Sequence, residues 1–163
     1  MTRQDIHVGV AGVGGIGLAN AAWLRQAGFG VSLWSPRGTG LAGPARCELH
    51  ATGVIGGSFE VQVAASAAEL SRHADVLVIA VPVNGHKAVF DALAPHLRTG
   101  QTVVVSSMSS LSALYAYELA RSRGVDITVV SMGTTTLTAR RAASNEVKVM
   151  TRRTRLGISA LPQ

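Results

Sequence analysis

The glycines at positions 12, 14 and 17 form the pattern in this sequence with the clearest chemical meaning, Gly12-x-Gly14-x-x-Gly17. In such a turn the first glycine permits a tight bend, the second lets the backbone approach a phosphate, and the third lets a helix pack closely on a sheet. The free N–H groups at the start of that helix, and its dipole, then favour negative charge. The pattern therefore predicts binding of a pyrophosphate.

The elements around this loop have the order that a dinucleotide site needs. Residues 6–10 are a short apolar run typical of a strand, and apolar residues recur at helical spacing from Ile16 until Gly28 can end the helix. Residues 31–34 form a second strand-like run, which completes a mononucleotide-binding half. The alternative interpretation of the Gly12–Gly17 pattern is a glycine-rich turn that binds no ligand. The residues expected to contact the cofactor here are Gly12, Gly14, Gly15, Ile16 and Gly17.

The end of the second strand reads Trp34-Ser35-Pro36-Arg37 and contains no acid. An acidic residue at this point binds the ribose hydroxyls of NAD and repels the 2′-phosphate of NADP. Arg37 can instead pair with that phosphate, and Ser35 can donate a hydrogen bond to it. We therefore expect Trp34, Ser35 and Arg37 to contact the cofactor, with NADP preferred over NAD. The alternative is that Arg37 is an ordinary solvated loop residue.

The rest of the chain alternates strand-like and helix-like segments. The expected elements are short strands within 47–63, a helix at 67–73, a strand at 75–81, a helix at 86–97, a strand at 102–105, a helix at 111–119 and a strand at 127–130. This order predicts an α/β, Rossmann-type, doubly wound and mainly parallel sheet with helices on both faces. Strand-like residues at 147–150 and 156–158 predict a short β extension at the C-terminus.

Two further groups follow predicted strands and are expected at the same edge of the sheet. Val81 and Pro82 follow one strand, and Ser106, Ser107 and Met108 follow the next. The carboxyl ends of parallel strands meet at one edge, which borders the nicotinamide side of such sites. We expect Val81, Pro82 and Met108 to contact the cofactor. An ordinary turn and helix cap is an equally good interpretation of the serines.

The histidines do not predict a metal site. None of the five is spaced from another His, a Cys or a carboxylate as metal ligands are. His86 lies near a helix start at the expected ligand edge and is the one candidate for a site, although a cleft residue without catalytic duty is the commoner interpretation. With no nucleophile motif and no phosphate-loop lysine, the catalytic residues are unknown.

Composition favours one domain in a reducing compartment. The chain has 163 residues, of which 47% are hydrophobic, so that it can form a substantial core. No apolar run approaches the ~20 residues of a membrane helix, and the N-terminus lacks the hydrophobic region of a signal peptide. The single Cys47 excludes an internal disulfide framework. We expect a cytoplasmic protein without a membrane partner.

The net charge of +6 is confined to one end of the chain. Residues 1–132 contain nine Lys or Arg and eight Asp or Glu, whereas residues 133–163 contain six basic residues and only Glu146. This tail lacks interleaved aromatic residues, so we expect no nucleic-acid partner. Its arginines are interpreted as a solvated or interface face; they are Arg140, Arg141, Arg152, Arg153 and Arg155. A role for Arg140 or Arg141 in binding an anionic substrate is a weaker alternative.

Several segments together resemble the N-terminal domain of the opine (octopine and nopaline) dehydrogenases. They are Gly12–Gly17, Val31–Trp34, Ala74–Pro82, and Leu93–Leu97 leading into Gly100–Val103. That domain is similar to those of glycerol-3-phosphate dehydrogenase and ketopantoate reductase. The stretch Thr134–Arg141 favours the opine enzymes, which have a Thr-Leu-…-Ala-…-Arg segment after the corresponding strand. The sequence Ala160-Leu161-Pro162 matches a later Ala-Leu-Pro of that family.

The resemblance implies an NAD(P)-dependent oxidoreductase acting on CH–NH bonds. In that family an amino acid condenses with a 2-keto acid, and a hydride from NAD(P)H reduces the imine to a secondary amine. The catalytic His–Asp pair and much of the substrate and dimer surface belong to a second, mostly helical domain. We therefore expect residues 1–163 to be a single dinucleotide-binding domain without that domain, inactive alone and self-associating as a homo-oligomer. The alternatives are a nucleotide-sensing module, or a ketopantoate-reductase-like or glycerol-3-phosphate-dehydrogenase-like fragment.

Overall fold

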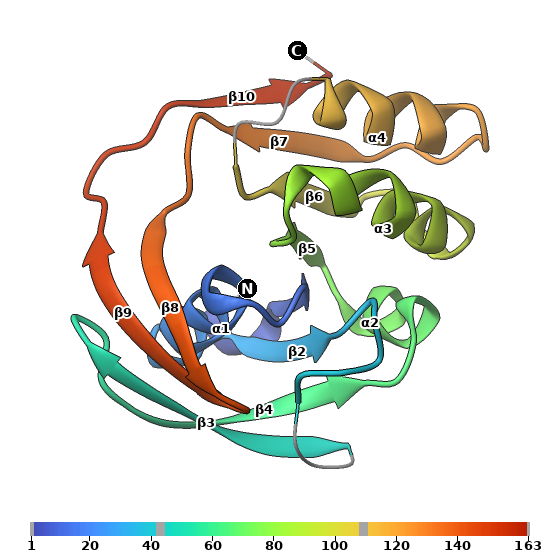
Figure 1. The fold of residues 1–163 in the computed structure, drawn as a ribbon. Coiled ribbons are helices and arrows are strands. Elements are labelled where there is room, and N and C mark those ends of the chain that lie inside the picture. The colour runs from blue at the N-terminus through green and yellow to red at the C-terminus, as the bar shows by residue number, and fades with distance from the viewer. Residues whose placement is uncertain (1, 42–44, 108–110, 163) are drawn as a thin grey trace.

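Ten strands form one continuous sheet in the computed structural model, which describes residues 2–41, 45–107 and 111–162 (Figure 1). The strands are β1 (His7–Ala11), β2 (Gly30–Trp34), β3 (Arg46–Gly53), β4 (Gly57–Ala64), β5 (Val76–Ile79), β6 (Thr102–Val105), β7 (Thr128–Met132), β8 (Leu137–Ala143), β9 (Glu146–Arg152) and β10 (Ile158–Leu161). The helices are α1 (Gly15–Gln26), α2 (Ala67–His73), α3 (His86–Leu93) and α4 (Ser112–Arg121), with 3₁₀ turns η1 (Arg3–Asp5), η2 (Val83–Gly85) and η3 (Ala94–His96).

The strand order is β10-β7-β6-β5-β1-β2-β4-β3-β9-β8, and the strands from β7 to β4 in this order are all parallel. Antiparallel partners flank them, with β10 beside β7 and β3 beside β4. Helix α1 packs on one face of the sheet, and α2, α3 and α4 pack on the other. The predicted Rossmann-type, doubly wound fold is therefore confirmed. None of the described helices is long and apolar enough to cross a bilayer.

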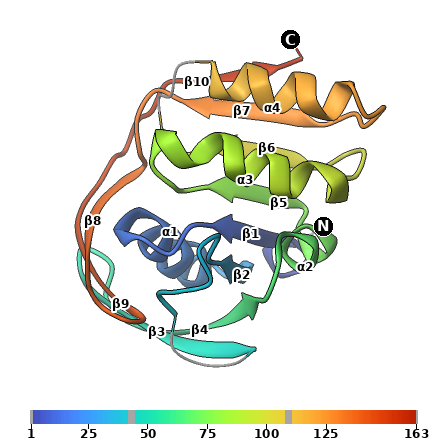
Figure 2. The ribbon, with the colours of Figure 1, turned by 45° about the vertical axis from the view of Figure 1, so that its right-hand side comes forward.

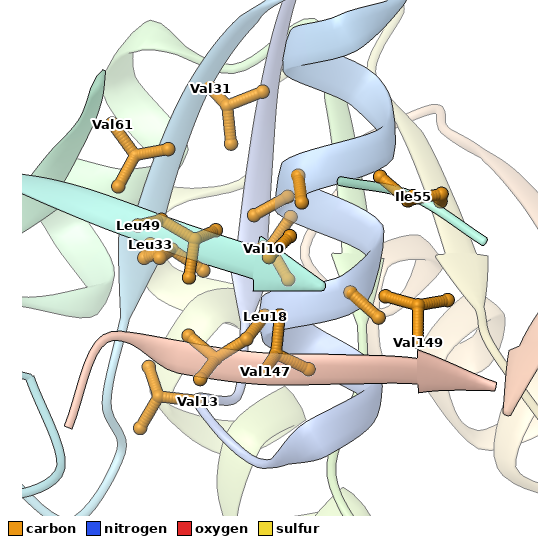
Figure 3. Close-up of a cluster of buried hydrophobic side chains, with 14 of the residues drawn as sticks. Val10, Val13, Leu18, Val31, Leu33, Leu49, Ile55, Val61, Val147 and Val149 are labelled. Carbon is orange, nitrogen blue, oxygen red and sulfur yellow. The ribbon is translucent and has the colours of Figure 1, made fainter. Parts of the chain in front are cut away.

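The sheet curls around α1, which becomes the centre of one of two hydrophobic cores (Figures 1 and 2). Leu18 and the small residues Ala19, Ala21 and Ala22 of α1 are fully buried. Side chains from β1, β2, β3 and β9 surround them, including Val10, Leu33, Leu49, Val147 and Val149 (Figure 3). Alanines at these positions let strands approach the helix from several directions. The C-terminal strands therefore complete the core around the cofactor helix.

The structure differs from the sequence predictions mainly in the last third of the chain. Strand β8 was not predicted, and β10 begins at Ile158, where the predicted strand ended. The helix expected over residues 86–97 is divided into α3 and the turn η3, because Pro95 has no N–H to continue the hydrogen bonding. The expected short strands within 47–63 form the antiparallel pair β3–β4, as predicted.

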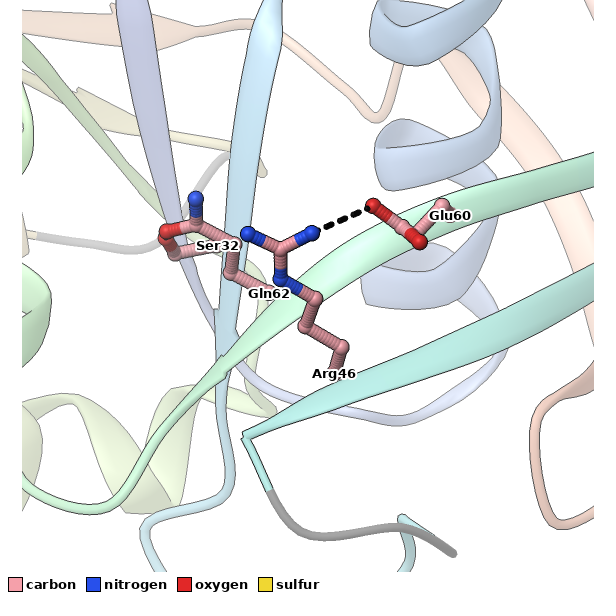
Figure 4. A network of polar contacts seen from close by, with 4 residues as sticks. All are labelled: Ser32, Arg46, Glu60 and Gln62. Atoms are coloured by element: carbon pink, nitrogen blue, oxygen red, sulfur yellow. Dashed lines mark hydrogen bonds and ion pairs between the residues drawn. The ribbon is translucent and has the colours of Figure 1, made fainter.

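A polar network links the first strands on the face opposite α1. The Nε2 atom of His7 lies 2.7 Å from the hydroxyl of Ser32, which donates to Gln62 of β4 at 3.3 Å. Beside it, the exposed Arg46 of β3 pairs with Glu60 of β4 at 3.2 Å (Figure 4). An exposed pair of this kind adds little stability, whereas the half-buried imidazole is sensitive to protonation.

Protonation of His7 is expected to make folding pH-dependent. Burial lowers the pKa of His7, the positive charges of His73 and Arg25 lower it further, and Asp75 acts in the opposite direction. Because the unfolded chain then takes up the proton more readily, the free energy of unfolding should fall as the pH drops below about 6.5. Urea unfolding measured between about pH 8 and pH 5 should show a weaker pH dependence in His7→Gln. Equal slopes in the two proteins would contradict this.

Candidate cofactor-binding site

The turn between β1 and α1 is held against the ends of both neighbouring strands. The N–H of Gly12 donates to the carbonyl of Trp34 at the end of β2, at 2.9 Å. Gly12 has φ +122°, and a Cβ atom at this position would lie 2.4 Å from the carbonyl oxygen of Ala80, after β5. Only glycine meets both conditions without strain. The first glycine of the motif therefore fixes the loop where the ends of three strands converge.

The other glycines have separate structural duties. A Cβ on Gly17 would lie 2.0 Å from the carbonyl oxygen of Gly12, so this glycine permits the close approach of α1 to the turn. A Cβ on Gly14 would meet no atom within 4 Å, and its φ of −75° is ordinary for any residue. Gly14 thus leaves open space at the start of α1, where the first helical N–H groups lack intrahelical acceptors. A pyrophosphate fits this cradle.

At the adenosine side of such a site, the residues after β2 form a short turn. The indole of Trp34 is buried in the second core, so its backbone rather than its ring faces the glycine loop. The hydroxyl of Ser35 donates to the carbonyl of Thr39, and Arg37 is exposed. No ion pair of Arg37 occurs among the described residues. Arg37 is therefore available to an anion, whereas Ser35 would have to exchange its present acceptor.

The residues after β5 are fixed by a buried histidine. His86 Nε2 donates to the carbonyl of Val81 at 3.0 Å, and its ring meets Phe90 edge-on. His86 is only 2% exposed, so it holds the turn through Pro82 in place and does not present an imidazole to solvent. Val81 lies beside the glycine loop, since one of its methyl carbons would be 3.0 Å from a Cβ on Gly12, and Pro82 follows it in the turn.

Ser106 carries an unsatisfied polar atom at the same edge. Its N–H donates to the carbonyl of Ile79, but its buried hydroxyl has no hydrogen-bond partner within the described ranges. A buried hydroxyl without a partner is unfavourable by about 1–3 kcal/mol, so such an atom needs an explanation, for which a bound water, an ion or a functional role is a common one. Met108, expected to contact the cofactor, lies outside the described residues. The described part of the chain holds no cluster of three or more His, Cys, Asp or Glu that could bind a metal.

Strand β8 is the part of the site that sequence analysis missed. A Cβ on Gly15 would lie 2.7 Å from the carbonyl oxygen of Ala139 and 3.1 Å from the backbone nitrogen of Arg141. The strand thus crosses the N-terminal turn of α1, and Thr136 just before it donates to Asn20 of that helix at 3.1 Å. The only sequence signal was the Thr-Leu-…-Ala-…-Arg likeness, which does not show where the segment lies.

The arrangement can hold a nicotinamide dinucleotide. The open space at Gly14, the first turn of α1 and the Ser106 hydroxyl, which has no partner among the described residues, lie at one edge of the parallel strands. When bound there, such a cofactor supplies or accepts a hydride. The chain's own residues bind and orient it; the described structure does not identify a general acid or base near this edge.

Solved structures with the same fold are dehydrogenases and reductases. An octopine dehydrogenase structure with NADH and pyruvate has a TM-score of 0.77 and 18% identity, covering 96% of this chain and 43% of that chain. A yersinopine dehydrogenase with NADP+ has a TM-score of 0.76 at 18% identity, covering 96% and 41%. A PanE/ApbA family ketopantoate reductase from Ralstonia eutropha has a TM-score of 0.68 at 18% identity, covering 94% and 49%. The chain thus spans less than half of each of these proteins.

The resemblance to the N-terminal domain of the opine dehydrogenases is therefore confirmed at the level of fold. No curated protein matches the sequence significantly. The family model described as ketopantoate reductase PanE/ApbA matches residues 8–163, which is almost the whole chain. The chain belongs to the ketopantoate reductase PanE/ApbA family of NAD(P)-dependent oxidoreductases.

Proposed function

We propose that this chain is the cofactor-binding domain of an opine-dehydrogenase-type oxidoreductase that prefers NADP. The observation that carries the cofactor assignment is the open cradle at Gly14, at the start of α1. The higher TM-scores of the octopine and yersinopine enzymes support the opine assignment over a ketoreductase. The reaction would be the reduction of an imine, formed from an amino acid and a 2-keto acid, to a secondary amine.

Reduction of ketopantoate or a similar 2-keto acid is the second candidate. The family match favours it, because the family that matches residues 8–163 is described as ketopantoate reductase. The two activities differ in their need for an amine. Oxidation of NADPH that requires both an amino acid and a 2-keto acid supports the opine assignment, whereas oxidation with ketopantoate alone supports the second. The assay should use the protein with any residues that its gene encodes beyond Gln163.

The part that residues 1–163 would play in such a reaction is to bind the cofactor. We propose that residues 1–163 bind the dinucleotide, as a homo-oligomer in the cytoplasm, but do not complete turnover alone. The nicotinamide ring would lie beside Val81, Pro82 and Ser106, and the substrate would approach from the same edge. Amino-acid-dependent oxidation of NADPH by this chain alone would disprove that part of the proposal.

The preference for NADP is expected to depend on Arg37. Removal of a charged hydrogen bond to the 2′-phosphate costs about 1.5–3 kcal/mol, so Arg37→Ala should weaken NADPH binding about 10- to 100-fold. Binding of NADH, which lacks that phosphate, should change by less than about twofold. Fluorescence titration of the reduced nicotinamide gives both dissociation constants.

A suitable control is Arg123→Ala, because Arg123 is also an exposed loop arginine but follows α4, far from the glycine loop. It should leave both affinities unchanged. Wild-type affinity for NADH equal to or tighter than that for NADPH would disprove the preference. An unchanged NADPH affinity in Arg37→Ala would assign the preference, if present, to other residues.

A further inference from the structure

Arg141 connects two segments that lie far apart in the sequence. Its Nη2 group donates to the carbonyl of Gly40, in the loop after β2, and its Nε–H donates to the carbonyl of Ala143 at 3.0 Å. A Cβ on Gly40 would lie 2.8 Å from Arg141 Nη1 and 3.0 Å from a methyl carbon of Val13. The guanidinium, the loop after β2 and the glycine loop therefore meet at one point.

The pairing of β8 with β9 explains why this arginine, and not its neighbour, reaches the loop. Arg141 lies opposite Val147, whose buried side chain faces α1, so Arg141 lies on the concave face of the sheet. Arg140 lies opposite Lys148, and both are exposed on the outer face. The two adjacent arginines are both exposed but lie on opposite faces of the sheet, although the sequence alone treats them alike.

The point of contact belongs to the adenosine half of the proposed site. In a Rossmann-type domain the adenosine ribose lies between the glycine loop and the end of the second strand. Val13 stands between the first two motif glycines, and Gly40 belongs to the same loop as Ser35 and Arg37. From a strand outside the mononucleotide-binding half, Arg141 donates to Gly40 on one side of that space, and its backbone nitrogen would lie 3.1 Å from a Cβ on Gly15 on the other.

We propose that Arg141 is a positioning residue for the adenosine half of the dinucleotide. It fastens the loop that carries Ser35 and Arg37 to β8, beside the glycine loop, and so makes the C-terminal strands part of the cofactor site. The proposal rests on the proposed cofactor function. A guanidinium can donate to two carbonyls at once in a fixed fork, which the single ammonium of a lysine reproduces poorly.

The test is calorimetric titration of the chain with 2′,5′-ADP, which carries the adenosine half of NADP and its 2′-phosphate. Three variants are compared with the wild type: Arg141→Ala, Arg141→Lys and the matched control Arg140→Ala. The affinity is expected to fall about tenfold in Arg141→Ala and by nearly as much in Arg141→Lys, because both lose the bridge. Arg140→Ala, which removes the same charge from the outer face, should bind within about twofold of the wild type.

Each other result has a definite meaning. Equal affinities of Arg141→Ala and Arg140→Ala for 2′,5′-ADP would overturn the positioning role of Arg141 and leave the proposed cofactor function standing. Wild-type affinity in Arg141→Lys would overturn the bridge, since charge without the fork would then suffice. If Arg141→Ala unfolds at a much lower temperature than Arg140→Ala, and its loss of affinity is no larger than the unfolded fraction explains, Arg141 would have a purely structural role. Failure of the wild type to bind 2′,5′-ADP or NADPH would instead overturn the proposed function.

Discussion

Gly14→Ala is expected to weaken cofactor binding strongly and leave the fold intact. The methyl group would occupy the open space at the start of α1, where the backbone must approach the pyrophosphate. A steric overlap and the lost N–H contacts together should weaken NADPH binding by about a hundredfold or more, since overpacking alone costs about 1–3 kcal/mol. The measurement is the dissociation constant from fluorescence titration, beside the free energy of unfolding from urea denaturation.

Stability should change little in this variant. The backbone of Gly14 has φ −75°, which alanine adopts without strain, and no atom stands within 4 Å of the new Cβ. Alanine is a poorer helix N-cap than glycine but restricts the unfolded chain more, so the two effects oppose each other and the net change is within about 1 kcal/mol.

Gly157→Ala is the matched control, because an added Cβ there also meets nothing within 4 Å and its φ lies outside the left-handed region. It should bind NADPH as the wild type does. If Gly14→Ala binds NADPH as tightly as Gly157→Ala, the glycine loop is not the pyrophosphate site. If Gly14→Ala unfolds, another part of the protein must occupy the space around position 14 in solution, and the cradle would not be open.

The glycine loop could be predicted from sequence because its determinants are local. A strand, a turn with fixed glycine spacing and a helix occupy residues 6–28, and each part restricts the next. The structure assigns Gly12 and Gly17 to close backbone contacts and Gly14 to open space, which is the division of duties that the motif predicts. The ends of β5 and β6 were also predictable, since parallel strands align their carboxyl ends.

The position of β8 could not be predicted, because it depends on the curl of the whole sheet. Arg141 reaches Gly40 across 101 residues of sequence, and that contact requires β3, β4 and β9 to carry β8 around α1. Alternation along 137–143 is irregular, with shifts of register after Thr138 and Arg141. A bulge changes which face a side chain takes, so the pattern of polar and apolar residues loses its meaning there.

The orientation of the Trp34 ring could not be predicted either, because both faces of the sheet are buried at β2. Leu33 and Trp34 are adjacent in β2 and therefore point to opposite faces, yet both are buried, because α1 covers one face and α2 the other. The sequence suggested Trp34 as a cofactor contact from its place at the strand end. Its backbone carbonyl does lie at the glycine loop, but its ring packs in the core.

Gly12→Ala is expected to be more destabilising than Gly14→Ala, Gly28→Ala or Gly157→Ala. The backbone at φ +122° lies in a region that is essentially restricted to glycine, which costs a residue with a side chain about 1–3 kcal/mol. The added Cβ would also lie 2.4 Å from the backbone oxygen of Ala80, which cannot move without disturbing β5. Together these effects should remove about 3–5 kcal/mol from the free energy of unfolding.

Gly28→Ala separates the two contributions, because Gly28 also has a positive φ, of +93°, but an added Cβ there meets nothing within 4 Å. It should cost only the backbone strain, about 1–2 kcal/mol. The difference between the two variants in urea denaturation then measures the contact between the glycine loop and the end of β5. Since native domains are stable by about 5–15 kcal/mol, Gly12→Ala should lose a large share of that free energy and unfold at a clearly lower urea concentration than Gly28→Ala. Equal losses in the two variants would mean that the turn does not press on β5, and the loop would then be free to move away from the strand ends that form the rest of the site.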